Sequence, residues 1–97
     1  MHVISYKHIR EFIKENPDSN IKLGRWYKWM KKGKYKSLAE LRRKFPDMDY
    51  IGNDRFVFNI SGNKYRLVVL INFCKQKAFI RFIGTHSEYE KINCKTI

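Results

Sequence analysis

The sequence has few cysteines, few prolines and no long apolar run. Cys74 and Cys94 are too few for a disulfide framework or a four-ligand zinc site, so we expect two reduced thiols. The rarity of proline and glycine, beside 43% hydrophobic residues, argues against a disordered chain. No apolar run approaches the roughly 18 residues of a membrane-spanning helix, and residues 1–7 lack the apolar core of a signal peptide. These absences predict one soluble, cytoplasmic domain over residues 1–97.

Acidic residues are also scarce. The chain holds 9 Asp and Glu against 21 Lys and Arg, which gives a formal net charge of +12. A surplus this large on a small domain predicts a polyanionic partner, either a nucleic acid or a membrane surface. Between positions 20 and 45 Glu40 is the single acid beside ten cations: Lys22, Arg25, Lys28, Lys31, Lys32, Lys34, Lys36, Arg42, Arg43 and Lys44. We interpret this run as a phosphate-facing surface; a merely solvated face is the alternative.

The first half of the chain has helical periodicity. Residues 1–5 predict a brief strand, and apolar spacing predicts a helix over 6–16 that is capped by Ser5 and ended before Pro17. A second helix, capped by Asp18 or Ser19, should reach about Lys32 before Gly33. A capping box over residues 37–40 predicts a short third helix that Pro46 ends.

Trp29 does not fit the apolar stripe of the second helix, which is formed by Leu23, Trp26, Tyr27 and Met30. It lies instead beside Lys22 and Arg25. An exposed tryptophan among cations could stack on a nucleic-acid base or anchor a protein partner. The alternative is that Trp29 fills the edge of the core.

The second half of the chain predicts strands. Residues 55–60 alternate, 61–63 form a hairpin connection, and 64–73 and 78–83 are apolar on both faces, which suggests central strands covered on each side. Three antiparallel strands plus the N-terminal one, with helices before them, predict an α+β domain.

Two arginines interrupt these apolar strands. Arg66 shares a strand face with Val68 and Leu70, and Arg81 lies between Ile80 and Phe82. Because arginine is almost never buried without a partner, each needs an explanation. One is an ion pair with an acid, for which the candidates are Asp54, Glu88 and Glu90. The other is a pair of planar donors aimed at a phosphate across the sheet.

A second capping box over residues 85–88 favours the phosphate interpretation. It predicts a helical turn with His86 at its start, Tyr89 three residues on and Glu90 four on. RNA cleavage by its own 2′-hydroxyl needs a base, an acid and cations against the phosphorane charge. His86, Tyr89 and Lys91 could transfer protons while Arg66 and Arg81 hold the phosphate. Since no set of carboxylates, histidines or cysteines offers a metal site, we expect a metal-independent reaction without a cofactor.

Two longer segments make a resemblance specific. Residues 57–69 (VFNISGNKYRLVV) and 79–89 (FIRFIGTHSEY) resemble the HigB toxins of bacterial type II toxin–antitoxin systems, and both ends of the chain look similar too. The resemblance implies a RelE-like fold: a small, mostly antiparallel sheet packed against an N-terminal helical hairpin plus a short third helix.

The same resemblance implies an mRNA interferase that cuts messenger RNA on the translating ribosome. It also implies a HigA-type helix-turn-helix antitoxin as partner. The positions that match the family are Arg66, Arg81, His86 and Tyr89, with Lys64 and Lys91 as weaker members. Family members often have Asp after the tyrosine, where this chain has Glu90.

Two other function classes stay open on the sequence alone. A non-catalytic RNA-binding module would use the charge without cutting, and its binding would weaken steeply with salt. The basic helix near Trp26 and Trp29 could instead bind a membrane surface, although a stripe that packs on the sheet explains it more simply.

Overall fold

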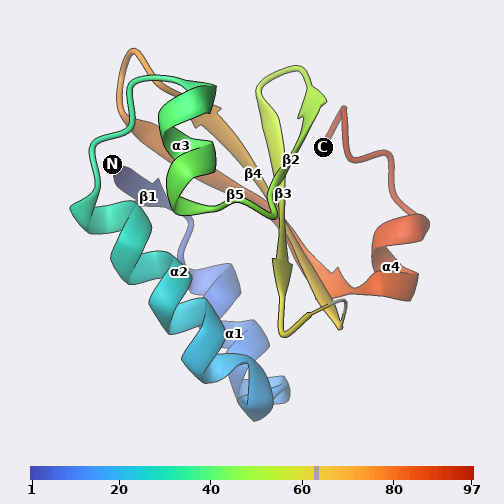
Figure 1. Cartoon of the computed structure of the whole chain (residues 1–97). Coiled ribbons are helices and arrows are strands. Elements are labelled where there is room, and N and C mark those ends of the chain that lie inside the picture. Colours follow the sequence, from blue (N-terminus) through green and yellow to red (C-terminus); the bar gives the residue numbers. More distant parts are fainter. Residues whose placement is uncertain (63) are drawn as a thin grey trace.

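A five-stranded sheet forms the centre of the computed structural model, which describes residues 1–62 and 64–97 (Figure 1). The strands are β1 (His2–Ile4), β2 (Asp49–Gly52), β3 (Arg55–Ile60), β4 (Tyr65–Asn72) and β5 (Lys77–Thr85). Their order across the sheet is β1-β5-β4-β3-β2. β1 pairs parallel with β5, and every other neighbouring pair is antiparallel.

Three helices cover one face of this sheet and the fourth lies on the other (Figure 1). The first three are α1 (Lys7–Glu15), α2 (Asn20–Lys32) and α3 (Leu38–Lys44), with a 3₁₀ turn, η1 (Pro17–Ser19), between α1 and α2. α4 (His86–Glu90) follows β5. The predicted α+β fold, with a mostly antiparallel sheet against a helical hairpin and a short third helix, is therefore confirmed.

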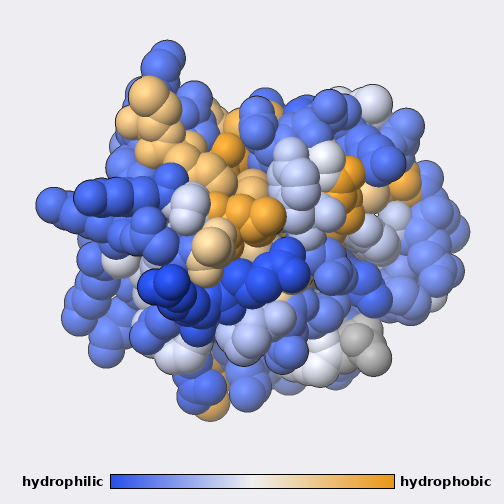
Figure 2. Space-filling model, turned by 45° about the horizontal axis from the view of Figure 1, so that its top comes forward, coloured by the Kyte–Doolittle hydropathy of each residue, from blue (hydrophilic) through white to orange (hydrophobic). Residues whose placement is uncertain are grey.

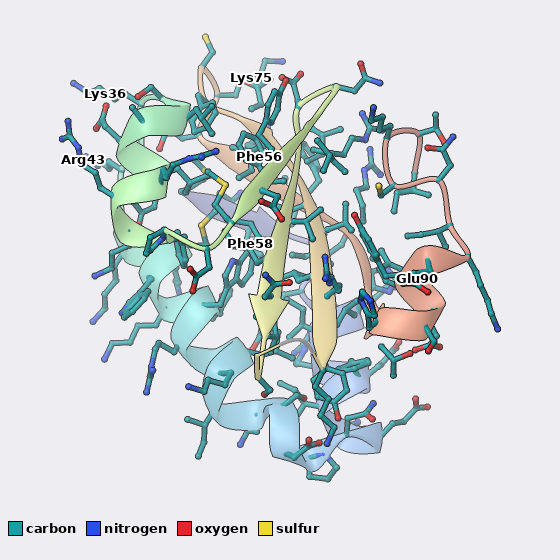
Figure 3. The ribbon with its side chains drawn as sticks, turned by 45° about the vertical axis from the view of Figure 1, so that its right-hand side comes forward. Lys36, Arg43, Phe56, Phe58, Lys75 and Glu90 are labelled. Atoms are coloured by element: carbon teal, nitrogen blue, oxygen red, sulfur yellow. The ribbon has the colours of Figure 1, made fainter. Side chains whose placement is uncertain are left out.

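The core lies between the sheet and α1–α3. Each helix contributes fully buried side chains, such as Ile9, Leu23 and Leu41, which pack against the strand residues Phe58 and Leu67. Figure 3 shows Phe56 and Phe58 on the side of β3 that faces these helices. Strand alternation places the remaining strand residues on the opposite face.

That opposite face is also partly buried, as the apolar strands predicted. Val57 and Val68 are cross-strand partners that are 1% and 0% exposed. The C-terminal segment returns to this side, where the carbonyl oxygen of Ile97 accepts hydrogen bonds from Arg55 Nη2 at 2.6 Å and Nε at 3.1 Å. The β4–β5 core of the sheet is thus closed on one side by α1–α3 and in part on the other by α4.

Several local predictions need correction. β2 was not predicted, because it is four residues long and its first two side chains are exposed. Its tight connection to β3 uses positive φ at Gly52, Asn53 and Asp54, residue types that tolerate this conformation. The predicted residues 61–63 do fall between β3 and β4, although residue 63 lies outside the described residues.

The predicted caps of the first two helices are confirmed only in part. Ser5 has φ +70° and does not cap α1, whose N-cap position is taken by Tyr6 without a side-chain bond. Ser19 does occupy the N-cap position of α2, but it makes no side-chain cap bond because its Oγ donates to Asn16 O at 2.6 Å. Ser37, by contrast, accepts the backbone N–H of Glu40 at 3.3 Å and caps α3 as predicted.

Candidate functional site

Arg66 lies on the sheet face that carries α4. Cross-strand pairing places it between Asn59 of β3 and Gly84 of β5. Gly84 leaves room there, because a Cβ atom would lie 2.6 Å from Phe82 Cζ and 3.0 Å from Glu88 Oε1, and one of these side chains would have to shift. The missing side chain lets α4 pack directly above the strand, within reach of Arg66.

The start of α4 is fixed by the predicted capping box. Thr85 Oγ1 accepts the backbone N–H of Glu88 at 3.2 Å, and Glu88 Oε1 accepts that of Thr85 at 2.8 Å. These bonds hold the pKa of the Glu88 carboxyl below its usual value. The N–H of His86 donates to Lys64 O at 3.3 Å, which ties the helix to the start of β4.

Tyr89 projects from α4 onto Arg66. The Arg66 Cζ atom lies 5.1 Å from the centroid of the Tyr89 ring, a cation–π arrangement, and the Phe82 ring lies 6.5 Å from the same ring. The Tyr89 hydroxyl donates to Cys94 Sγ at 3.4 Å. Burial, followed by this bond, raises the pKa of Tyr89 to about 12. The phenol is therefore protonated at neutral pH, so it is suited to donate a proton or a hydrogen bond.

His86 stands at the exposed side of the same turn. Its Nε2 atom lies 3.0 Å from Glu90 Oε1, an i,i+4 contact on the helix surface. Figure 3 shows Glu90 on α4, away from the three helices across the sheet. The Glu90 carboxylate therefore lies beside the imidazole, at the position where family members often have Asp.

One hydrogen-bond donor of the Arg66 side chain has no acceptor among the described residues. This donor is the Nε atom, which is buried. The side chain forms no ion pair with a described carboxylate, so the ion-pair explanation of this strand arginine does not hold. A guanidinium that is half-buried, stacked on a phenol and unpaired is arranged to accept an anion.

Arg81 lies elsewhere. β4 pairs Val68 with Phe82 and Val69 with Ile80, so Arg81 is the extra residue of a β-bulge in β5. Its exposed side chain lines a hollow on the α1 side of the sheet, whose other walls include His8, Glu11, Phe12 and Glu15. Within residues 1–62 and 64–97, no hydrogen bond, ion pair or cation–π contact joins Arg81 to Arg66, His86 or Tyr89. The two arginines therefore do not converge as predicted.

The two weaker candidates flank the cluster. Lys64 Nζ lies 2.5 Å from Asp18 Oδ2, and Tyr65 donates its hydroxyl to Asp18 Oδ1 at 2.8 Å. Lys64 is thereby tied to the turn between α1 and α2. Lys91 is the exposed C-cap residue of α4.

The basic run is fully exposed, as the phosphate-facing interpretation requires. All ten cations between positions 20 and 45 are exposed, on α2, α3 and the segment between them. These helices lie across the sheet from α4 (Figure 1). Figure 2 shows a largely hydrophilic surface with apolar residues gathered in its middle.

Trp29 is half-buried. Its ring centroid lies 5.7 Å from that of Phe45, and Lys44 Nζ lies 4.2 Å from the Trp29 ring centroid.

The sequence-based reasoning missed three residues of this neighbourhood. Asn59 pairs with Arg66, Asp18 binds Lys64, and Cys94 accepts from Tyr89. An alternating strand does place Asn59 on the face of Arg66, but only the register makes them neighbours. No local signal marks Asp18 or Cys94, because both contacts depend on how distant segments fold back.

The described residues offer neither a metal site nor a membrane-spanning helix. In the part of the chain that the structure describes, no three His, Cys, Asp or Glu side chains form a group that could hold a metal ion. None of its described helices is long and apolar enough to cross a membrane.

The comparisons with known proteins agree with the fold and the sequence motifs. Residues 19–92 match the family described as HigB_toxin, RelE-like toxic component of a toxin-antitoxin system. A protein of Escherichia coli O6:H1 named mRNA interferase HigB is 30% identical over 95% of this chain and 91% of its own length. The mRNA interferase toxin HigB of Escherichia coli K12 and the mRNA interferase HigB of Shigella flexneri are each 32% identical, over 93% of this chain and 88% of theirs. The chain therefore belongs to the HigB family of RelE-like toxins of toxin–antitoxin systems.

Proposed function

We propose that residues 1–97 act as one cytoplasmic toxin domain that cleaves messenger RNA. The activity named for the relatives, mRNA interferase, supports this proposal. The observation that carries it in this chain is the Arg66 guanidinium, with its unpartnered Nε, stacked on a protonated Tyr89 beside His86.

In the proposed reaction the RNA 2′-hydroxyl attacks the adjacent phosphorus. The 2′-O–P bond forms, the P–O5′ bond breaks, and the products carry a 2′,3′-cyclic phosphate and a 5′-hydroxyl. His86 takes the proton of the 2′-hydroxyl, and Tyr89 donates a proton or a hydrogen bond to the leaving 5′-oxygen. Each such group contributes about 10²–10⁴-fold. Lys91 is the alternative proton donor.

The cations of this chain would balance the phosphorane charge. Arg66 donates to the phosphate oxygens through its planar guanidinium, and Lys64 and Lys91 flank it. We therefore propose that the reaction needs no metal ion. Because Arg81 lies apart from the cluster, we propose that it binds RNA phosphate away from the reacting bond.

The ribosome is the proposed site of action. The basic residues of α2, α3 and the segment between them (Arg25, Lys28, Lys31, Lys32, Lys34 and Lys36) lie across the sheet from α4. Ribosomal RNA could therefore contact one side of the toxin while the phosphate to be cut lies on the other. We propose a HigA-type helix-turn-helix antitoxin as the partner, since the family is defined by toxin–antitoxin pairs.

The experiment compares cleavage of a translated message by the wild type, Arg66→Ala, His86→Ala and the charge-matched surface control Lys75→Gln. Arms with and without ribosomes, and with EDTA, test ribosome and metal dependence. We expect the wild type and Lys75→Gln to cut with ribosomes in EDTA, and the two site variants to lose at least about 100-fold in rate.

Each alternative has its own outcome. RNA binding without cut product from the wild type would favour a non-catalytic RNA-binding module. Unchanged cleavage by Arg66→Ala and His86→Ala would refute the proposed site, but the proposal that the protein is a nuclease would still hold. Equal cutting without ribosomes would discard the docking role of the basic helices.

A further inference from the structure

A groove lies on the helix side of β3, away from the proposed cleavage site. β2 pairs with β3 through partners of Arg55, Phe56 and Val57, so in the described part of the chain residues 58–60 have no neighbouring strand on that edge. α2 and the connection between α3 and β2 flank this open edge and enclose a hollow of about 240 Å³. The fold therefore leaves a concave space beside the part of β3 that β2 does not reach.

The walls combine aromatic rings with cations. One stripe of α2 supplies Lys22, Arg25, Trp26 and Trp29, which recur at helical spacing. Phe45 and Phe58 add apolar walls, and Lys44 adds a third exposed cation against one acid, Asp47. Trp26 and Phe58 are core residues, but Trp29 and Phe45 are partly exposed. Exposed rings that can stack on a base, surrounded by cations that can meet phosphate, are features of single-strand nucleic-acid sites.

Two buried polar atoms of the groove residues have no hydrogen-bond partner among the described residues. They are the donor Trp26 Nε1 and the acceptor Asn59 Oδ1. A buried polar group left unpaired is costly, so such atoms mark places where a ligand or water completes the structure. Trp26 lies on the groove side of the sheet, where an acceptor on the edge of a nucleobase could meet its Nε1, whereas Asn59 lies on the face of Arg66.

Asn59 also links the groove to the proposed cleavage site. It lines the groove and is the direct cross-strand partner of Arg66, whose Nε is likewise unpaired. A single strand that passes over the edge of β3 at Asn59 would reach from the groove to the guanidinium. Cross-strand partners lie about 5 Å apart, so the edge of β3 at Asn59 is close to Arg66.

We propose that this groove is a nucleotide-binding subsite of the toxin. It would receive one base of the single-stranded message next to the cut, where the strand passes over the edge of β3, with the flanking phosphates against Lys22 and Lys44. This inference rests on the proposed nuclease function. A peptide added as a strand fits less well, because the open edge offers three residues and a typical strand has about five or six.

Tryptophan fluorescence tests the subsite directly, since Trp26 and Trp29 are the two tryptophans of the chain and both line the groove. A His86→Ala background prevents cleavage during titration with a short single-stranded oligoribonucleotide. We expect quenching that saturates together with the anisotropy of the labelled RNA. A duplex of the same sequence should bind without quenching, because its bases are already paired and stacked.

Charge variants in that background locate the phosphates. Lys22→Gln or Lys44→Gln should weaken binding and lower the salt slope by about 0.7 each. Lys75→Gln makes the same charge change on an exposed residue of the β4–β5 turn and should leave quenching intact. Labelled RNA that binds without quenching, or equal effects of all three substitutions, would overturn the proposal.

The remaining outcomes separate this inference from the proposed function. If the wild type cuts message with ribosomes while Lys22→Gln and Lys44→Gln cut like Lys75→Gln, the subsite is wrong and the nuclease stands. If the wild type cuts nothing, the proposed function fails whatever the groove binds. If purified antitoxin quenches the tryptophans and RNA does not, the groove is a protein interface and the proposal is refuted.

Discussion

Arg66 and Tyr89 form the central contact of the proposed cleavage site, with the guanidinium carbon 5.1 Å from the centroid of the phenol ring. The contact holds the cation beside a hydroxyl that donates to Cys94. One residue comes from the middle of the sheet and the other from a five-residue helix, so their meeting depends on the capping box and on Gly84. Stability and chemistry at this site can therefore be separated by substitutions that change one of these parts.

Tyr89→Phe distinguishes the role of the Tyr89 hydroxyl from the role of its ring. The substitution keeps the aromatic face over Arg66 and removes the hydroxyl and its bond to Cys94. If the hydroxyl serves the leaving 5′-oxygen, the cleavage rate should fall by about 10²–10⁴-fold while RNA affinity and the unfolding temperature change little. Single-turnover cleavage and thermal unfolding check this. An unchanged rate would assign Tyr89 a packing role and move the proton donor to Lys91.

Gly84→Ala tests the close approach of α4. The new methyl group would lie 2.6 Å from Phe82 Cζ and 3.0 Å from Glu88 Oε1, so the ring or the capping box must move. We expect a loss of about 1–3 kcal/mol in the free energy of unfolding, with a parallel loss of cleavage.

Gly24→Ala is the matched control, because the same substitution there meets no atom within 4 Å and lies inside α2. It should stabilise the protein by about 0.5–1 kcal/mol and leave cleavage unchanged. Denaturant unfolding of both variants checks the pair. Equal stability changes in the two would show that Gly84 is not sterically required.

The sequence predicted the parts of this site better than their arrangement. The capping box at Thr85 and the face of Arg66 follow from local spacing, and both are confirmed. The β-bulge at Arg81 cannot be predicted from local spacing, because the register of β4 on β5 decides which residue of β5 is left without a partner. β2 escaped prediction for a similar reason: its four residues become a strand only through pairing with β3.

Asp18→Asn tests the link between the helical hairpin and the start of β4. The hydrogen bonds from Lys64 and Tyr65 hold the pKa of the Asp18 carboxyl below its model-compound value of 3.8. The stabilisation is therefore present at pH values above 3.8 and is lost as the pH falls through the lowered folded-state pKa. Thermal unfolding should show a wild-type advantage at pH 7 that disappears toward pH 2. A higher unfolding temperature of the wild type that persists at pH 2 would show that the stabilisation does not depend on the ionised Asp18 carboxylate.

The raised pKa of Tyr89 makes a prediction at the alkaline end. Burial favours the neutral phenol, so the folded protein should keep this proton up to about pH 12, whereas an unfolded tyrosine releases it near 10. Stability linked to Tyr89 is thus complete below pH 10 and is lost as the pH rises from 10 toward 12.

Ultraviolet absorbance of phenolate, measured as the difference between the wild type and Tyr89→Phe, isolates this group from the other five tyrosines. We expect the difference signal to rise near pH 12 if the protein stays folded, or together with alkaline unfolding if it does not. In either case the Tyr89→Phe variant should lose less stability between pH 10 and pH 12 than the wild type. A difference signal centred near pH 10 in the folded protein would show that the phenol is solvated and would contradict the raised pKa of Tyr89.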